Sequence, residues 1–286
     1  MDYIVDLHTH SNITDGSCTP KELIDVAVKE KVKAIALTDH DNIGGLEEAA
    51  KYAKEKNIDF LKGIEISALY RDGRIIHILG IGIDPTNGVF SNAYRVMKEA
   101  RQEGVKHLLS EIKKQGVDIP IEELKDKALG EYLDRYDIFR YFTRNKMYTT
   151  AQGIWDKYLD PVPYGDKELI KVEDAIKIIK EARGLSFLAH YNKTMGFAGL
   201  NAQEMEKEIS YLVSLGLDGV ERYYPTFNEE DHKYLDYLIE KYNLMCSGGA
   251  DYHGSNRPEI KLGRGLNNNI STSYKLYEKI IAKLSS

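Results

Sequence analysis

The sequence predicts an α/β fold in which helices cover a parallel sheet that closes into a barrel. Seven short apolar runs rich in β-branched residues recur along the chain, and amphipathic helical stretches lie between most of them. Near-continuous apolar strands that alternate with helices are typical of parallel sheets buried on both faces. No glycine-rich phosphate loop follows the first strand, which favours a barrel over a doubly wound sheet.

The predicted strands are the apolar runs themselves, at residues 3–8, 33–38, 60–66, 75–83, 185–189, 217–222 and 244–247. The first predicted helix begins at Thr19-Pro20-Lys21-Glu22, a capping box with proline at the first helical position. Further helices are predicted at residues 46–56, 172–182, 202–215, 229–242 and 273–284. Gly184 follows the predicted helix at 172–182 and Gly216 follows the one at 202–215, as is common at helix C-termini.

The alternation of strand and helix breaks between Pro85 and Gly165. Only helical patterns occur there, at residues 93–115, 121–128, 136–145 and 151–159. We interpret residues 86–165 as a helical insertion over the strand ends, a lid. Residues 1–85 and 166–286 then form one discontinuous barrel domain.

Composition excludes several classes of protein. The chain has 286 residues, enough to bury a sizeable core, and its 39 basic and 45 acidic residues give a net charge of −6. An acidic chain lacks the field that binders of long duplex nucleic acid use, but a local site can still hold a small phosphorylated ligand. No apolar run is long enough to span a bilayer and no secretory leader is visible. With only two cysteines, we expect a reduced, cytoplasmic protein.

Histidines gather where the predicted strands lie. Six of the eight lie in or just beyond a strand: His8, His10, His40, His77, His190 and His253. Parallel barrels build their active sites at the C-terminal ends of their strands. His8 and His10 are two residues apart, so on an extended strand both imidazoles point to the same face and can reach one metal ion. The pattern predicts a metal site.

Three carboxylates complete the candidate ligand set: Asp15, Glu65 and Asp251. Imidazole with carboxylate and no thiolate suits zinc, manganese or iron. The three carboxylates carry −3, so two divalent ions leave +1 and three leave +3. Such a pocket binds phosphate and lowers the pKa of a bound water.

These residues resemble the motifs of the PHP (polymerase and histidinol phosphatase) family. The motifs follow one another in the family's order along nearly the whole chain: His8-Thr9-His10, Asp15, Thr38-Asp39-His40-Asp41, Gly63-Ile64-Glu65, His77, Ala189-His190 and Asp251-Tyr252-His253. The resemblance implies a distorted (βα)7 TIM-like barrel with two or three divalent ions at the strand C-termini. It implies one ion on His8, His10, Glu65 and Asp251, a second on Glu65, His77 and His190, and a third on Asp15, His40 and His253.

The insertion and residues 77–84 are similar to one branch of the family. Its members are phosphatases acting on nucleoside 3′,5′-bisphosphates or monophosphates, and some trim short RNA from its 5′ end. The resemblance implies a metal-dependent phosphoesterase that hydrolyses phosphomonoesters of small nucleotides by a metal-bridging hydroxide. Asp39 and Asp41 flank His40 and are expected to orient imidazoles or to cap a loop; either is also a candidate general acid.

The substrate side departs from that branch. Tyr191 stands where the branch usually has proline, Arg135-Tyr136-Asp137 replaces its Arg-x-His, and Thr226-Phe227 replaces its Ser-His pair. Arg135 matches the branch's arginine, and Arg222 and Tyr223 end the sixth strand. The predicted substrate-binding residues are therefore Arg135, Arg222, Tyr191 and Tyr223.

Other functions remain open at this point. One alternative is a phosphatase of the histidinol type, and another is a metal-dependent amide or lactone hydrolase. A third, a non-catalytic polymerase-associated module, is disfavoured because all nine ligand positions hold a residue that can bind metal. The expected partner is a small phosphorylated substrate, with no long duplex nucleic acid and no membrane.

Overall fold

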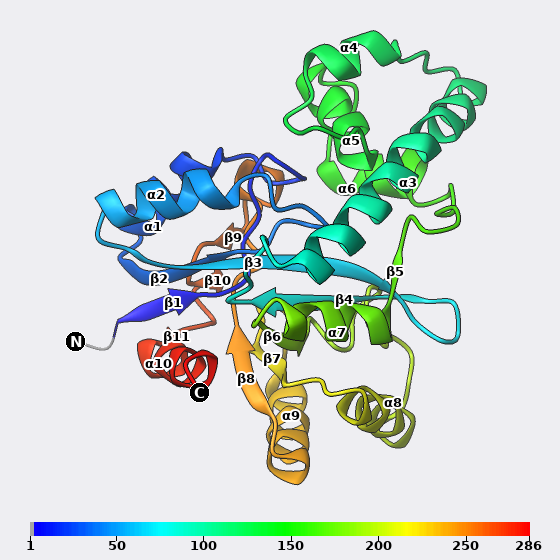
Figure 1. Cartoon of the computed structure of the whole chain (residues 1–286). Helices are drawn as coiled ribbons and strands as arrows, with labels where there is room; N and C mark the ends of the chain where they lie inside the picture. Colours follow the sequence, from blue (N-terminus) through cyan, green and yellow to red (C-terminus); the bar gives the residue numbers. More distant parts are fainter. Residues whose placement is uncertain (1–2) are drawn as a thin grey trace.

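The computed structural model describes residues 3–286 and shows a nearly closed, barrel-like sheet wrapped by helices (Figure 1). The strands that follow the seven predicted runs are β1 (Ile4–Asp6), β2 (Val32–Leu37), β3 (Asp59–Leu69), β4 (Ile75–Ile81), β6 (Leu185–Leu188), β7 (Gly219–Tyr223) and β8 (Met245–Gly248). They lie in the order β1-β2-β3-β4-β6-β7-β8. Leu7 donates its N–H to the carbonyl of Gly248 (3.1 Å), which brings β8 back to β1. The predicted barrel fold is confirmed.

Strand β4 corrects the expectation of an all-parallel sheet. It pairs antiparallel with both neighbours, β3 and β6, whereas β1, β2 and β3, and likewise β6, β7 and β8, run parallel. A short connection joins β3 to β4, and a hairpin requires antiparallel strands. The N-terminal end of β4 therefore lies at the same mouth as the C-terminal ends of the parallel strands. His77, which pairs opposite Ser67 near the start of β4, reaches that mouth for this reason.

Four short strands were not predicted because each has only two residues. They are β5 (Ile170–Lys171), β9 (Ile260–Lys261), β10 (Gly265–Leu266) and β11 (Thr272–Ser273). β5 extends the sheet beside β3, and β11 pairs antiparallel with β1 at the edge. β9 and β10 form a separate antiparallel pair.

The helices around the sheet lie within a residue or two of their predicted bounds. They are α1 (Pro20–Lys29), α2 (Leu46–Glu55), α7 (Val172–Glu181), α8 (Ala202–Ser214), α9 (Glu229–Tyr242) and α10 (Tyr274–Leu284). The predicted capping box is present, with Thr19 accepting from the N–H of Glu22 and Glu22 accepting from that of Thr19. None of the helices within residues 3–286 combines the length and the apolar character needed to cross a membrane.

The segment between β4 and β5 is helical and lies to one side of the sheet (Figure 1). It contains α3 (Gly88–Lys114), α4 (Ile121–Asp126), α5 (Arg135–Arg144), α6 (Ala151–Ile154) and one π-helical turn, η1 (Trp155–Leu159). Its apolar side chains form a cluster of their own, with Phe139, Phe142 and Leu159 buried in it. The helical insertion is thus present, while its division from the barrel as a separate domain, and its role as a lid, stay predictions.

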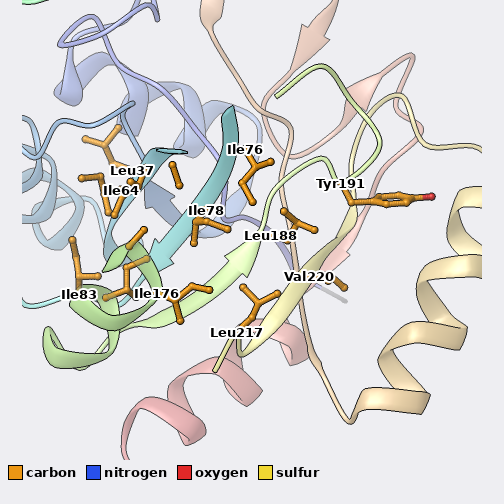
Figure 2. Close-up of a cluster of buried hydrophobic side chains, with 14 of the residues drawn as sticks. Leu37, Ile64, Ile76, Ile78, Ile83, Ile176, Leu188, Tyr191, Leu217 and Val220 are labelled. Atoms are coloured by element: carbon orange, nitrogen blue, oxygen red, sulfur yellow. The ribbon is translucent and has the colours of Figure 1, made fainter. Parts of the chain in front are cut away.

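Alternation along the strands divides the barrel core into two layers. In β2, Ala34 and Ala36 belong to a cluster with Leu79 and Phe187, whereas Ile35 and Leu37 belong to the larger cluster under the helices. Successive side chains of a strand point to opposite faces, so small residues pack on one face and large ones meet the helices. Figure 2 shows part of the larger cluster, in which Ile64, Ile78 and Leu188 from three strands face Ile176 of α7.

Candidate metal centre

The nine predicted ligand residues meet at one mouth of the barrel. The segments after β1 and β2 carry His8, His10, Asp15 and His40; β3 and β4 carry Glu65 and His77; the segments after β6 and β8 carry His190, Asp251 and His253. Every one of them is at most 8% exposed. His190 and Asp251 adopt positive φ angles (25° and 50°), an unfavourable conformation for such residues and one that clusters at functional sites.

Three groups within this cluster have the geometry of a metal site, with one ligand atom per residue and all of these atoms within 4.8 Å of one another. The groups are His8-His10-Glu65-Asp251, His10-Asp15-His40-His253 and His40-Glu65-His77. The first matches the set implied by the family resemblance. The second adds His10 to the implied Asp15-His40-His253, and the third has His40 where His190 was implied.

Glu65 lies at the centre of the cluster. Its Oε2 is 3.1 Å from Nε2 of His8 and 3.1 Å from Nδ1 of His40, and its Oε1 is 2.8 Å from Nδ1 of His77. Nε2 of His190 is also close, 3.0 Å from Oε1. One carboxylate therefore contacts imidazoles from four different segments, which is the arrangement expected of a bridging ligand.

Buried atoms without hydrogen bonds test whether the residues fit metal ions. Among the residues that the structure describes, 3–286, these buried atoms of the cluster find no hydrogen-bond partner of acceptable geometry: both nitrogens of His10, Nδ1 of His40, Nδ1 of His190, Nε2 of His253 and Oδ1 of Asp15. Leaving buried polar atoms unpaired is costly, and native proteins rarely do so without an ion or water. Nitrogen and carboxylate oxygen donors that crowd together without bonding one another fit divalent cations.

Within the cluster, charges of opposite sign counteract the effect of burial on the pKa of individual residues. Burial would raise the pKa of Glu65, but the charges of His8, His40 and His77 outweigh it and hold that pKa well below its usual range. Burial would lower the pKa of His10, but Asp251 and Glu65 outweigh it and raise that pKa to about 9. Burial instead holds the pKa of His40 well below its usual range, so the cluster mixes histidines of raised and lowered pKa. An incoming ion takes the place of any proton that its ligand atom carries.

Glu221, which the sequence argument did not select, holds two of the histidines. It is fully buried on β7, with Oε1 2.8 Å from Nδ1 of His8 and Oε2 accepting the backbone N–H of His190 (2.8 Å). A carboxylate on the far nitrogen of a ligand histidine sets its tautomer and ring orientation. The available signal was an acid directly after the apolar Val220, inside the strand Gly219–Tyr223.

Asp39 and Asp41 both have their carboxylates occupied. Asp39 accepts from the N–H and hydroxyl of Ser11 (2.7 and 2.6 Å) and from the hydroxyl of Thr14 (2.7 Å). Asp41 accepts from the N–H of Ser67 (2.8 Å) and from Nη2 of Arg101 on α3 (2.7 Å). These hydrogen bonds tie neighbouring segments together, and the roles in orienting imidazoles, capping a loop or acting as general acid stay predictions.

The four predicted substrate-binding residues are not brought together. Arg135 is buried within the insertion, where it donates to the carbonyl of Leu159 and its guanidinium lies 3.9 Å from the ring centre of Tyr164. Arg222 turns to α9 and pairs with Asp236 (2.6 Å).

The two predicted tyrosines, Tyr191 and Tyr223, also lie in different surroundings. Tyr191 is buried in the apolar cluster, as Figure 2 shows, and donates to Asp231 of α9 (3.0 Å). Tyr223 is half-buried at the end of β7, with Arg222 over its ring. These placements do not favour substrate roles for Arg222 and Tyr191; all four roles remain predictions.

A cleft opens beside the cluster that none of these four residues lines. It has a volume of about 600 Å³ and runs between the barrel mouth and the insertion. Asp15, His253 and Arg257 line it from the barrel, and Tyr148 and Trp155 line it from the insertion. Arg257 and Trp155 were not predicted as site residues. The available signals were the position of Arg257 four residues after His253 and the fact that Trp155 is the only tryptophan of the sequence.

A family model described as the PHP domain matches residues 6–250. One curated relative, a 3′,5′-nucleoside bisphosphate phosphatase of Chromobacterium violaceum, is 30% identical over 257 residues, which is 87% of this chain and 87% of the relative. A phosphoribosyl 1,2-cyclic phosphate 1,2-diphosphodiesterase of Eggerthella lenta is 28% identical, over 88% of this chain and 94% of that protein. A 5′-3′ exoribonuclease of Haemophilus influenzae is 29% identical, over 87% and 89% respectively.

Among solved structures, one from Bifidobacterium adolescentis superposes with a TM-score of 0.81. It covers 97% of this chain and 95% of the other, at 22% sequence identity, and its description as a metal-dependent phosphoesterase is itself an inference. At that identity the superposition supports the fold alone. The barrel with its helical insertion is therefore an arrangement that a distant sequence also adopts.

Proposed function

The chain belongs to the PHP domain family of metal-dependent phosphoesterases, and on that premise we propose that it hydrolyses phosphomonoesters of small nucleotides. The substrates proposed are nucleoside 3′,5′-bisphosphates, nucleoside monophosphates or short 5′-phosphorylated RNA. The observation that carries the proposal is the buried cluster of nine histidines and carboxylates with unpaired ligand atoms at the barrel mouth.

We assign the metal-holding role to the residues of that cluster. One ion would be held by His8, His10, Glu65 and Asp251, and a second by Asp15, His40 and His253. Glu65 and His77, with His190 close to Glu65, would hold a further ion. The proposed cofactors are two or three divalent ions: manganese, zinc or iron. When bound, such ions neutralise phosphoryl oxygens and activate water for attack on phosphorus.

The surrounding residues act on this centre by holding it in place. Glu221 fixes the ring of His8, and Asp39 ties the segment that carries His10 and Asp15 to the end of β2. Arg257 donates to Oδ2 of Asp251 (2.7 Å) and adds positive charge beside the cluster. Preorganised charge of this kind supplies most of the rate enhancement in phosphoryl transfer.

A second candidate substrate is favoured by one relative. The protein of Eggerthella lenta is named for hydrolysis of a phosphoribosyl 1,2-cyclic phosphate, a sugar phosphate without a base. The same metal cluster would serve either substrate, because it contacts only the phosphate. The two candidate substrates differ in whether the cleft beside the cluster must accommodate a base.

A substrate panel tests the proposed function. The purified chain is assayed with manganese, zinc or iron. The substrates are nucleoside bisphosphates and monophosphates, 5′-phosphorylated RNA, phosphoribosyl 1,2-cyclic phosphate, histidinol phosphate, amides and lactones. We expect kcat/KM to be highest for a nucleotide phosphomonoester. Activity confined to histidinol phosphate or to carbonyl substrates, or no activity with any ion, would overturn the proposal.

The variant His8→Ala ties that activity to the cluster. Loss of a metal ligand removes several kcal/mol of transition-state stabilisation, so we expect kcat/KM to fall by roughly a thousand-fold or more. His107→Ala is the matched control, because His107 is exposed on α3, far from the cluster in sequence, and makes a long contact with Glu111 (3.9 Å). Equal activity of the two variants would show that the cluster is not the active site.

A further inference from the structure

The cleft of about 600 Å³ beside the cluster has two unlike walls. The barrel wall contains Asp15 and His253, two members of the metal-site groups, together with Arg257. The insertion wall contains the rings of Trp155 and Tyr148. A molecule that fills the cleft therefore meets the predicted ions at one side and aromatic rings at the other.

The ring of Trp155 is held rigidly at this wall. It stacks on Phe139, with ring centres 5.6 Å apart and planes at 24°, and meets Tyr136 edge-on at 5.3 Å. Phe139 and Tyr136 are themselves buried, and Tyr136 stacks on His40 of the cluster (5.7 Å, 8°). Trp155 itself is half-exposed and begins the π-helical turn η1, a local irregularity that is frequent at functional sites. A partly exposed ring that packs against buried rings offers a preorganised stacking surface.

Two positively charged side chains, Arg257 and Lys146, line the cleft and suit a ligand that carries both an anionic and an aromatic group. Arg257 is held by Asp251, so its guanidinium cannot swing freely, and part of its side chain (38%) remains exposed. Lys146 lies on the opposite wall. Arg257 thus places a fixed positive charge between the cluster and the aromatic wall.

We propose that this cleft binds the heterocyclic base of the substrate, which stacks on Trp155 while the phosphate lies at the metal cluster. The inference rests on the proposed function and deepens it, since it selects substrates that carry a base. Stacking of a base on an aromatic side chain changes affinity by about 5- to 150-fold. Nucleotides therefore gain over a phosphoribosyl substrate, which offers no ring to Trp155.

Kinetics with paired substrates test the inference. The ratio of kcat/KM for adenosine 5′-monophosphate to that for ribose 5-phosphate is measured for the wild-type chain, Trp155→Phe and Trp155→Leu. We expect the ratio to fall about 5- to 150-fold in Trp155→Leu, which keeps apolar bulk but has no π-face, and to recover largely in Trp155→Phe. Tyr237→Ala, at an exposed tyrosine of α9, is the control and should leave the ratio unchanged.

Fluorescence of the wild-type chain gives a readout that does not depend on turnover. Trp155 is the only tryptophan, so its emission reports the cleft alone. Immediately after rapid mixing, adenosine 3′,5′-bisphosphate should quench it, whereas ribose 5-phosphate at the same concentration should not.

The outcomes separate the two proposals. An unchanged ratio in Trp155→Leu, or equal fluorescence with both ligands while nucleotides are hydrolysed, would overturn the base site and leave the phosphoesterase function standing. Failure of the wild-type chain to hydrolyse any phosphomonoester would overturn the proposed function itself.

Discussion

At the scale of single residues, the site depends on buried carboxylates that contact the imidazole rings of the cluster. Glu65 contacts ring nitrogens from four segments, and Glu221 holds His8 from behind while accepting the N–H of His190. Both are fully buried, where an unpaired carboxylate would be costly. The burial is tolerated because each oxygen has a partner.

Replacing Glu221 tests this support directly. Glu221→Gln keeps the shape but removes the charge that orients His8, so we expect metal affinity and kcat/KM to fall by about 10- to 100-fold. Metal affinity is measured by titration of the metal-free chain. Glu230→Gln, at an exposed acid on α9, is the control. Metal affinity that stays the same in Glu221→Gln would argue that His8 needs no partner.

At the scale of elements, two arginines of the insertion make hydrogen bonds to the barrel. Arg101 of α3 donates to Asp41 after β2 and to the carbonyl of Glu168. Arg140 of α5 donates to the backbone carbonyl of Ile13 and to Asp137 on its own helix. Since Ile13 lies two residues before Asp15, α5 positions the segment that carries a predicted ligand.

The pair Arg140 and Arg144 allows a matched test of that contact. Arg140→Gln should make hydrogen exchange in residues 11–16 faster, because charge-assisted hydrogen bonds contribute about 1.5–3 kcal/mol each. Arg144 is exposed and pairs with the exposed Glu123 (3.3 Å), so Arg144→Gln should leave exchange in that segment unchanged. The measurement is exchange followed by mass spectrometry. Equal exchange in both variants would remove Arg140 from this role.

At the scale of the whole molecule, an acidic chain holds a dense group of buried ionisable residues at one mouth of the barrel. The net charge is −6, yet the cluster holds six histidines that share three carboxylates in a nearly solvent-free space. The barrel core below it is apolar, with Leu79 and Phe187 among its fully buried residues. The unpaired ligand atoms therefore mark the place where a bound ion would add most to stability.

Thermal unfolding with and without ions measures this contribution. A ligand that binds only the folded chain at 100 times its Kd stabilises it by about 2.7 kcal/mol, which raises Tm by several degrees in a protein of this size. We expect manganese or zinc to raise Tm relative to the chelator-treated chain, and His8→Ala to lose most of the increase. A Tm that no divalent ion changes would contradict the metal cluster.

Sequence patterns alone were enough to predict the seven main strands, the helices around the sheet and nine residues whose chemistry suits metal binding. Local patterns carry that information, because apolar periodicity, capping residues and the spacing of His8 and His10 act over a few positions. The role of those nine residues as metal ligands nevertheless stays a proposal.

Sequence patterns did not reveal the antiparallel direction of β4, the pairing of Arg222 with Asp236 or the place of Trp155 in the same cleft as His253. The first follows from the short connection between β3 and β4, whereas the other two depend on how separate elements pack against one another, as the contact of Glu221 with His8 also does. No local pattern encodes which face of a strand meets a helix or what lines a cleft between two parts of the molecule, since packing of the whole chain settles both.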